Sequence, residues 1–347
     1  MRFAALHTGV PVRCNVAMSK RTVETVTGPI DTGQLGTTLM HEHLVIGFSG
    51  WEADTMRPGP KRAEMIATCV GRIGELQARG VRSLLDPCPN DLGRDVELAA
   101  EVASKTGLHI VCATGLYTEQ QGGRGYWHQR SLFGPVVETM AELFVHELTV
   151  GIGETGIKAG VIKIAAGANQ ITDYERSVLH AAAIASNATG APITTHTDQG
   201  TMGDAQQAEL VALGVPPHRI IIGHSCGTDD HAYHMKIVDG GSYVGFDRFG
   251  INVLFPDDKR VASLLALLRR HKERQIVLSH DSVWCWRGEP VPQAVATALD
   301  DGIVFNPTHL HDHVIPRLLE AGVTRAQIDT MLIDNPRRYF ADDPPSA

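Results

Sequence analysis

Two histidines one residue apart, His41 and His43, follow an apolar run in the stretch TTLMHEHLV (residues 37–45). Alternate side chains of an extended chain point to opposite faces, so the two imidazoles share one face and Glu42 points to the other. Such a pair can hold a metal ion at a strand end, because imidazole is a common ligand of divalent first-row ions. A histidine at a strand end is often structural, so the role of this pair depends on the residues at the ends of the other strands.

Four other strand ends carry polar residues of the same kind. Together with the histidine pair they make a set of six: His41, His43, Lys163, His196, His224 and Asp281. Lys163 lies inside the apolar stretch GVIKIAAG, and burying an unpaired ammonium is costly. A shared divalent metal centre would satisfy all six. A buried lysine can also react with carbon dioxide, giving a carbamate whose two oxygens each take one metal. Lys158 lies before the apolar part of this strand, so we expect Lys163 to have this role.

The elements that must position these residues are short apolar runs that alternate with helical patterns. The predicted strands span residues 37–43, 81–87, 108–115, 159–165, 191–196, 219–224, 242–248 and 275–281. Runs rich in Val and Ile are typical of parallel strands buried on both faces. Helices are predicted after a capping box at Thr172 and Glu175, and over residues 261–271. Eight strands with intervening helices predict an α/β fold, a (β/α)8 TIM barrel. The six polar residues would then form a binuclear metal centre at the C-terminal ends of its strands. A doubly wound sheet is disfavoured because no glycine-rich phosphate loop follows the first strand.

Composition excludes several classes of protein. The chain has 347 residues, 43% hydrophobic and 20% charged, with a formal net charge of -8. It has no basic run, which argues against a nucleic-acid partner, and no apolar stretch long enough to span a membrane. Six scattered cysteines without a CxxC pair favour the cytoplasm. We expect a loose extension at 1–20, with Met18 an alternative initiator, a single domain at 21–341 and a disordered tail at 342–347.

The motifs TLMHEH, TGIKAGVIKIA, ITTHT, IIIGHS, GFDRFG, LSHDS and LIDNPRRYF together resemble the phosphotriesterase-related family of the amidohydrolase superfamily. Within it they are most similar to the phosphotriesterase-like lactonases, from about residue 24 to about residue 340. The resemblance implies a homodimer and two divalent ions per chain. Zinc is the first expectation, with cobalt, manganese and iron as alternatives. The implied ligands are His41, His43 and Asp281 for one ion and His196 and His224 for the other, with N6-carboxylated Lys163 bridging them.

The implied reaction is hydrolysis by a hydroxide shared between the metals, with Lys163 and Asp281 as the catalytic residues. Asp281 would accept the proton of the hydroxide and pass it toward the leaving group. Tyr117 and Arg248 match a tyrosine and an arginine that border the substrate pocket in the lactonase branch. Phosphotriesterases proper usually have histidine in place of Arg248. We therefore predict a lactone or other carboxylic ester as the substrate, with promiscuous organophosphate triesterase activity.

Several alternatives stay open. Gly227 stands where the family commonly has a proton-relaying aspartate, so the relay is absent or supplied by Asp229 or Asp230. Trp284 and Trp286 could wall an apolar substrate pocket or pack against neighbouring loops. A phosphotriesterase proper is the nearest rival. An amidase acting on N-acyl amino acids is favoured if the loop at 124–130 binds a carboxylate. A non-catalytic relic would be expected to have lost a ligand, but all six are present.

Overall fold

The structure is a computed structural model that describes residues 22–290 and 305–344. The predicted extension at 1–20 and the alternative initiator therefore lie outside the described residues. Eight strands form one parallel sheet in the order β11-β10-β9-β8-β7-β6-β5-β3. These strands are β3 (Thr37–Leu39), β5 (Val81–Asp86), β6 (His109–Gly115), β7 (Val161–Lys163), β8 (Ile193–Thr194), β9 (Ile220–Ile222), β10 (Tyr243–Phe246) and β11 (Ile276–Leu278).

The sheet closes on itself between its two outer strands, β3 and β11. The Met40 amide donates to the Leu278 carbonyl at 3.4 Å, and the Asp281 amide donates to the His41 carbonyl at 3.0 Å. Between these two bonds, the His41 amide donates to Oγ of Ser279 at 2.9 Å. The predicted (β/α)8 barrel is thereby confirmed.

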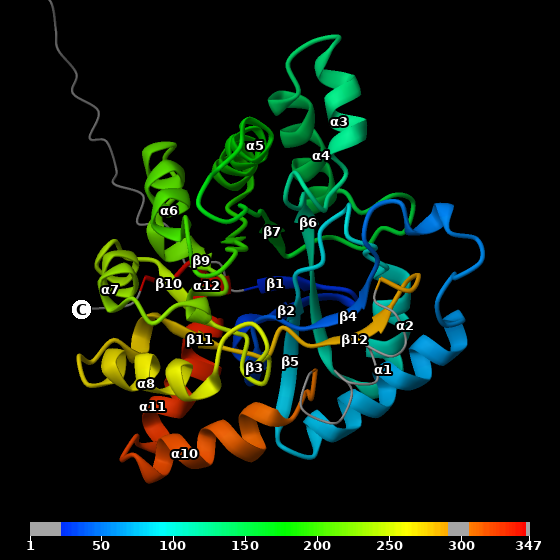
Figure 1. Cartoon of the computed structure of the whole chain (residues 1–347). Helices are drawn as coiled ribbons and strands as arrows, with labels where there is room; N and C mark the ends of the chain where they lie inside the picture. Colours follow the sequence, from blue (N-terminus) through cyan, green and yellow to red (C-terminus); the bar gives the residue numbers. More distant parts are fainter. Residues whose placement is uncertain (1–21, 291–304, 345–347) are drawn as a thin grey trace, which may run out of the picture.

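The helices lie around the strands, as Figure 1 shows. They are α1 (Arg62–Gln77), α2 (Val96–Thr106), α3 (Arg124–Ser131), α4 (Val137–Thr149), α5 (Asp173–Thr189), α6 (Gly203–Ala212), α7 (His231–Asp239), α8 (Asp257–Leu268), α10 (Ile315–Glu320), α11 (Arg325–Asp329) and α12 (Asn335–Ala341). The predicted capping box starts α5, where the Glu175 amide donates to Thr172 Oγ1 at 3.2 Å. The helix predicted over 261–271 is instead α8, which starts four residues earlier and ends three earlier. Among the described residues, no helix is long and apolar enough to cross a membrane.

Side-chain alternation along the strands builds two apolar layers. Leu85, Val111 and Val161 point into the barrel and form one buried cluster. Their neighbours Leu84 and Ile110 belong to a second, larger cluster that packs the strands against the helices. Because the strands are buried on both faces, they appear in the sequence as continuous apolar runs.

An antiparallel hairpin, which the sequence did not predict, covers the N-terminal end of the barrel. It consists of β1 (Thr22–Thr25) and β2 (Gly28–Asp31). The Val26 amide donates to the Ile110 carbonyl at 2.9 Å, and Val23 joins the interior cluster. Strands this short carry too few side chains to show a period.

The C-terminal tail begins later than predicted. Asp342, assigned from the sequence to a disordered tail, accepts hydrogen bonds from His218 Nε2 at 2.9 Å and from Arg219 Nε at 2.5 Å. These two partners fix its carboxylate against the turn that precedes β9. Residues 345–347 lie outside the part of the chain that the structure describes.

The first predicted strand, 37–43, is in fact two strands. β3 ends at Leu39, and β4 (His43–Ile46) pairs in parallel with β12 (Val283–Trp286) above the barrel. The break falls at His41 and Glu42 because their amides bond elsewhere, to Ser279 Oγ and to the Leu85 carbonyl respectively. His41 thus lies within the break, just beyond β3, whereas His43 begins β4.

We expect that replacing Gly115 with alanine will disturb the site through the backbone. Gly115 has φ +130°, and an added Cβ would lie 1.8 Å from the Lys163 carbonyl oxygen. Strain and overpacking should lower the free energy of unfolding by about 3 kcal/mol. Denaturant unfolding measures this change. Gly71→Ala is the matched control, since its Cβ would meet nothing within 4 Å and alanine should stabilise α1 by about 0.5 kcal/mol. A Gly115→Ala protein as stable as the parent would contradict the expectation.

Candidate metal centre

The structure brings the six predicted ligands to the C-terminal edge of the barrel. Each lies at or just beyond the end of a strand or, for His43, at the start of β4. Five of the six are at most 4% exposed, and the side chain of Asp281 is 12% exposed. Parallel strands end at the same edge, which is why residues far apart in the sequence meet there.

Three imidazoles point their Nε2 atoms at the Asp281 carboxylate. His41 Nε2 and His43 Nε2 lie 3.4 Å and 3.3 Å from its Oδ1, and His224 Nε2 lies 3.8 Å from its Oδ2. His41, His43 and Asp281 thus offer three ligand atoms within 4.8 Å of one another. Asp281 itself has φ +55°, a left-handed conformation uncommon for a non-glycine residue.

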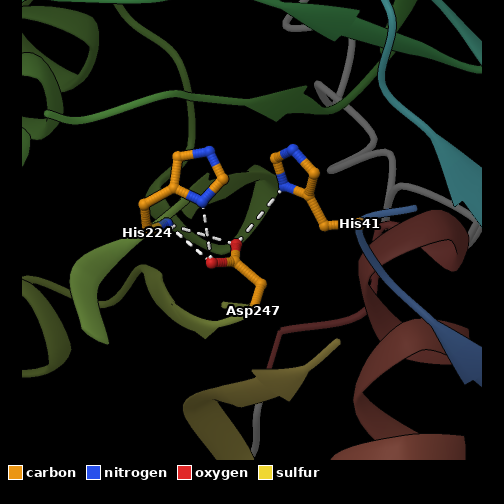
Figure 2. Close-up of side chains that lie close together, drawn as sticks. All are labelled: His41, His224 and Asp247. Atoms are coloured by element: carbon orange, nitrogen blue, oxygen red, sulfur yellow. Dashed lines mark hydrogen bonds and ion pairs between the residues drawn. The ribbon is translucent and has the colours of Figure 1, made fainter. Parts of the chain in front are cut away.

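Asp247 holds two of these imidazoles from behind (Figure 2). Its Oδ1 accepts from His224 Nδ1 at 2.9 Å, and its Oδ2 lies 3.3 Å from His41 Nδ1. The carboxylate is 1% exposed and also accepts the backbone amide of His224 at 2.9 Å. A carboxylate on Nδ1 fixes the orientation of an imidazole and leaves Nε2 free for a metal.

A second carboxylate supports His43 in the same way. Asp86 Oδ1 lies 3.5 Å from His43 Nδ1, and Oδ2 accepts the Leu44 amide at 3.1 Å. Asp86 is the last residue of β5, so this strand too contributes to the site. The three imidazoles around Asp281 are therefore each backed by a buried carboxylate.

Lys163 is the last residue of β7 and is 1% exposed. Its Nζ lies 3.4 Å from His41 Nε2 and 3.3 Å from the Thr195 carbonyl oxygen, and it forms no ion pair with a carboxylate of the described residues. Burial lowers the pKa of Lys163 to about 8. A substantial fraction of the amine is then neutral near physiological pH, the form that reacts with carbon dioxide. Lys158 precedes β7, away from this edge.

His196 has both ring nitrogens engaged. Nδ1 lies 3.2 Å from the Tyr117 hydroxyl and Nε2 lies 2.8 Å from Asp198 Oδ1. Its ring centre is 4.6 Å from that of His224, so it adjoins the cluster. Coordination through either nitrogen would replace one of the two hydrogen bonds.

The other predicted contacts divide into those at the cavity and those elsewhere. A cavity of about 630 Å³ lies over the cluster, and its lining includes Tyr117, Arg248 and Trp286. Arg248 Nε donates to Asp281 Oδ2 at 2.8 Å, so the arginine pairs with a predicted ligand. Trp284 does not line the cavity: it packs in the core, with Nε1 donating to Ser282 Oγ at 2.9 Å.

Neither candidate for the proton relay lies at the site. Asp229 pairs with Lys259 at 3.0 Å on the surface, where both side chains are 54% exposed. Asp230 caps α7 by accepting the amide of Ala232 at 2.9 Å. Among the described residues, Asp198 and Asp281 are the carboxylates that line the cavity.

The charge state of the imidazoles suits a metal. Burial lowers the pKa of His41, lowers that of His196 to about 4 and lowers that of His224 well below its usual value. Burial also opposes a charge on His43, but hydrogen bonds to Asp281 and Asp86 raise its pKa well above the usual value. The neutral imidazoles of His41, His196 and His224, beside carboxylates, fit a divalent first-row ion.

Three carboxylates of the site were missed from the sequence: Asp247, Asp86 and Asp198. Asp86 ends a barrel strand and Asp247 follows one, as the predicted ligands do. This position in the sequence could have identified both.

The fold and site define a (β/α)8 barrel with a candidate metal centre, and comparisons with known proteins place it further. The sequence profile of the Phosphotriesterase family matches residues 21–340. A phosphotriesterase homology protein of Mycobacterium tuberculosis is 39% identical over 323 residues, covering 92% of this chain and 97% of its own length. An aryldialkylphosphatase of Saccharolobus solfataricus is 33% identical over 317 residues, covering 90% and 97%. A mutant of a PTE-like lactonase from Deinococcus radiodurans superposes with a TM-score of 0.87 at 39% identity, covering 92% and 100%.

The chain therefore belongs to the phosphotriesterase family, as its motifs predicted. Its class is that of a hydrolase.

We predict that Asp247→Asn weakens metal binding by about 10–100-fold, because the amide nitrogen cannot accept from an imidazole Nδ1–H. Competition with a chromophoric chelator measures the affinity. Asp258→Asn is the control, since Asp258 is 87% exposed on α8 and pairs with Arg317, away from the site. Parent-like affinity in the Asp247→Asn protein would show that the carboxylate does not support the ligands.

Proposed function

We propose that this protein is a metal-dependent hydrolase of lactones or other carboxylic esters. The observation that carries the proposal is the cavity above the cluster. His41, His43, Lys163, His196, His224 and Asp281 all line it, together with Tyr117 and Arg248. A substrate in this cavity would meet the candidate metal centre directly. The likeness to a PTE-like lactonase supports the same reading.

The cavity walls favour an uncharged substrate. They include the apolar side chains of Ile46, Phe48, Leu92, Leu254, Val283 and Trp286. The guanidinium of Arg248, which lines the cavity, is already paired with Asp281. A charged substrate would lose hydration without gaining a free counter-charge, whereas an ester ring or chain loses little.

The donor set would hold two divalent ions, zinc being the first expectation. His41, His43 and Asp281 would hold one and His196 and His224 the other, with carboxylated Lys163 shared between them. Such ions lower the pKa of water and polarise the oxygen of an electrophile. Asp281 stays ionised, because the charge of Arg248 and a hydrogen bond with His43 overcome its burial and hold its pKa well below the usual value. Its carboxylate is therefore available to accept a proton.

Phosphotriester hydrolysis is a second activity that we propose for the same cavity. It is favoured by the 33% identity to an aryldialkylphosphatase. An uncharged triester suits the apolar walls as an ester does. The amidase alternative depended on carboxylate binding by residues 124–130, which lie in α3. Arg124 is 54% exposed, and its guanidinium already pairs with the Glu119 carboxylate at 2.8 Å. This segment therefore does not support an amidase.

A substrate panel tests the proposal. Protein loaded with zinc, cobalt or manganese is assayed on lactones, uncharged phosphotriesters and N-acyl amino acids, beside chelator-treated protein. We expect the highest kcat/KM on a lactone, loss of turnover on metal removal, and recovery when metal and bicarbonate are restored together. Lactone turnover no faster than that of the metal-free protein would refute the proposal.

The two tryptophans of β12 form a matched pair for testing the cavity. Trp286 lines it and lies over Phe48, with ring centres 6.0 Å apart, whereas Trp284 is buried in the core. We expect Trp286→Ala to raise KM about 10-fold for lactones with an alkyl chain, with a small effect on Tm. Trp284→Ala should lower the free energy of unfolding by about 3 kcal/mol and leave KM of the folded protein unchanged. Equal KM values in the two variants would contradict this assignment.

A further inference from the structure

Two buried cysteines meet where α1 packs against β12. Cys69 in α1 is 0% exposed and Cys285 in β12 is 5% exposed, and both are free thiols. The thiol of each cysteine is the largest influence on the pKa of the other, raising that of Cys69 and lowering that of Cys285.

The backbone around them fixes how close they are. Cys285 Sγ donates to the Met65 carbonyl at 3.8 Å. In a helix, that carbonyl accepts the amide of the residue four positions later, which is Cys69. From the other side, Cys69 Sγ donates to the Leu44 carbonyl at 3.7 Å, and Cys285 lies opposite Val45, the next residue of β4. Each thiol therefore contacts a backbone carbonyl next to the other cysteine. Both contacts are long, weak hydrogen bonds, so they constrain the thiols little.

We propose that Cys69 and Cys285 are a redox-responsive pair that peroxide converts to a disulfide joining α1 to β12. The neighbouring thiol of Cys69 lowers the pKa of Cys285, so the thiolate develops there. This thiolate attacks one oxygen of hydrogen peroxide, giving a sulfenic acid and hydroxide. The sulfur of Cys69 then attacks the sulfur of Cys285, and its proton leaves with the sulfenic hydroxyl as water. Two thiols and one peroxide give one disulfide and two waters, and the sulfurs lose the two electrons that the peroxide gains.

The disulfide would act on the wall of the cavity. β12 carries Val283 and Trp286, which line the cavity, and Val283 lies opposite His43 in the register with β4. The disulfide would link this strand covalently to α1 and close a loop of the chain that includes most of the barrel. It would reduce the conformational entropy of the unfolded chain, so the oxidised protein should have a higher Tm, by about 5 °C.

Peptide mapping tests the proposal without altering either cysteine. The full-length, metal-loaded Cys14→Ser protein is treated with hydrogen peroxide, alkylated in denaturant and digested without reduction; the substitution removes the cysteine that lies outside the described residues. We expect a linked peptide pair containing Cys69 and Cys285, which dithiothreitol separates, together with the rise in Tm. Full alkylation of both cysteines, or irreversible oxidation of either without a link, would overturn the proposal.

Two further variants separate the pair from the other thiols. In Cys69→Ala, Cys285 should react with a sulfenic-acid probe such as dimedone and form no disulfide. Cys226→Ala is the matched control, because Cys226 is also 0% exposed but lies in the turn Ser225–Gly227 after β9, on neither α1 nor β12. It should form the Cys69–Cys285 disulfide as the parent does. A disulfide-linked peptide containing Cys285 in the Cys69→Ala protein would contradict the assignment. So would loss of the Cys69–Cys285 disulfide in the Cys226→Ala protein.

Discussion

The site depends on the way Glu42 closes the barrel. Its carboxylate is 0% exposed and accepts hydrogen bonds from Ser279 Oγ at 2.8 Å, from His280 Nδ1 at 2.7 Å and from the hydroxyl of Ser282. These three residues surround Asp281, so the bonds hold its left-handed backbone beside the end of β3. A buried carboxylate is tolerated because its hydrogen bonds replace its hydration. The residue between the two histidines is thus structural, as alternation predicted, and it brings Asp281 to them.

Buried carboxylates order the ligands as well as the backbone. Asp247 orients His41 and His224, and Asp86 lies behind His43. These protein contacts turn the Nε2 atoms of the imidazoles toward Asp281. A preorganised site spends less of its binding free energy on ordering side chains. This arrangement explains why the C-terminal ends of β5 and β10 matter although neither carries a predicted ligand.

The barrel and its ligands could be read from the sequence because both follow simple rules. Parallel strands buried on both faces are apolar runs, and a polar residue at the end of such a run is conspicuous. The ends of the strands and the residues that support the predicted ligands were harder to predict. His43 proved to start a separate strand, since hydrogen bonds to Ser279 and Leu85 interrupt the predicted one. Trp284 and Trp286 share a sequence pattern yet separate into core and cavity, because the Ser282 hydroxyl and the packing of α1 decide where Trp284 lies. Contacts of this kind have no periodic signature.

The charges around Lys163 show how this buried cluster can be stable and still attract a metal ion. Lys163 and Arg248 are cationic, Asp247 and Asp281 are anionic, and all four are buried or nearly so. Because burial keeps the imidazoles of His41, His196 and His224 neutral, these four charges balance one another. Conversion of the lysine to a carbamate replaces one positive charge by one negative charge. The same four groups would then carry two excess negative charges in a largely buried site, which would favour a divalent cation. Carboxylation of Lys163 and metal binding would then promote one another, because each would be electrostatically costly alone.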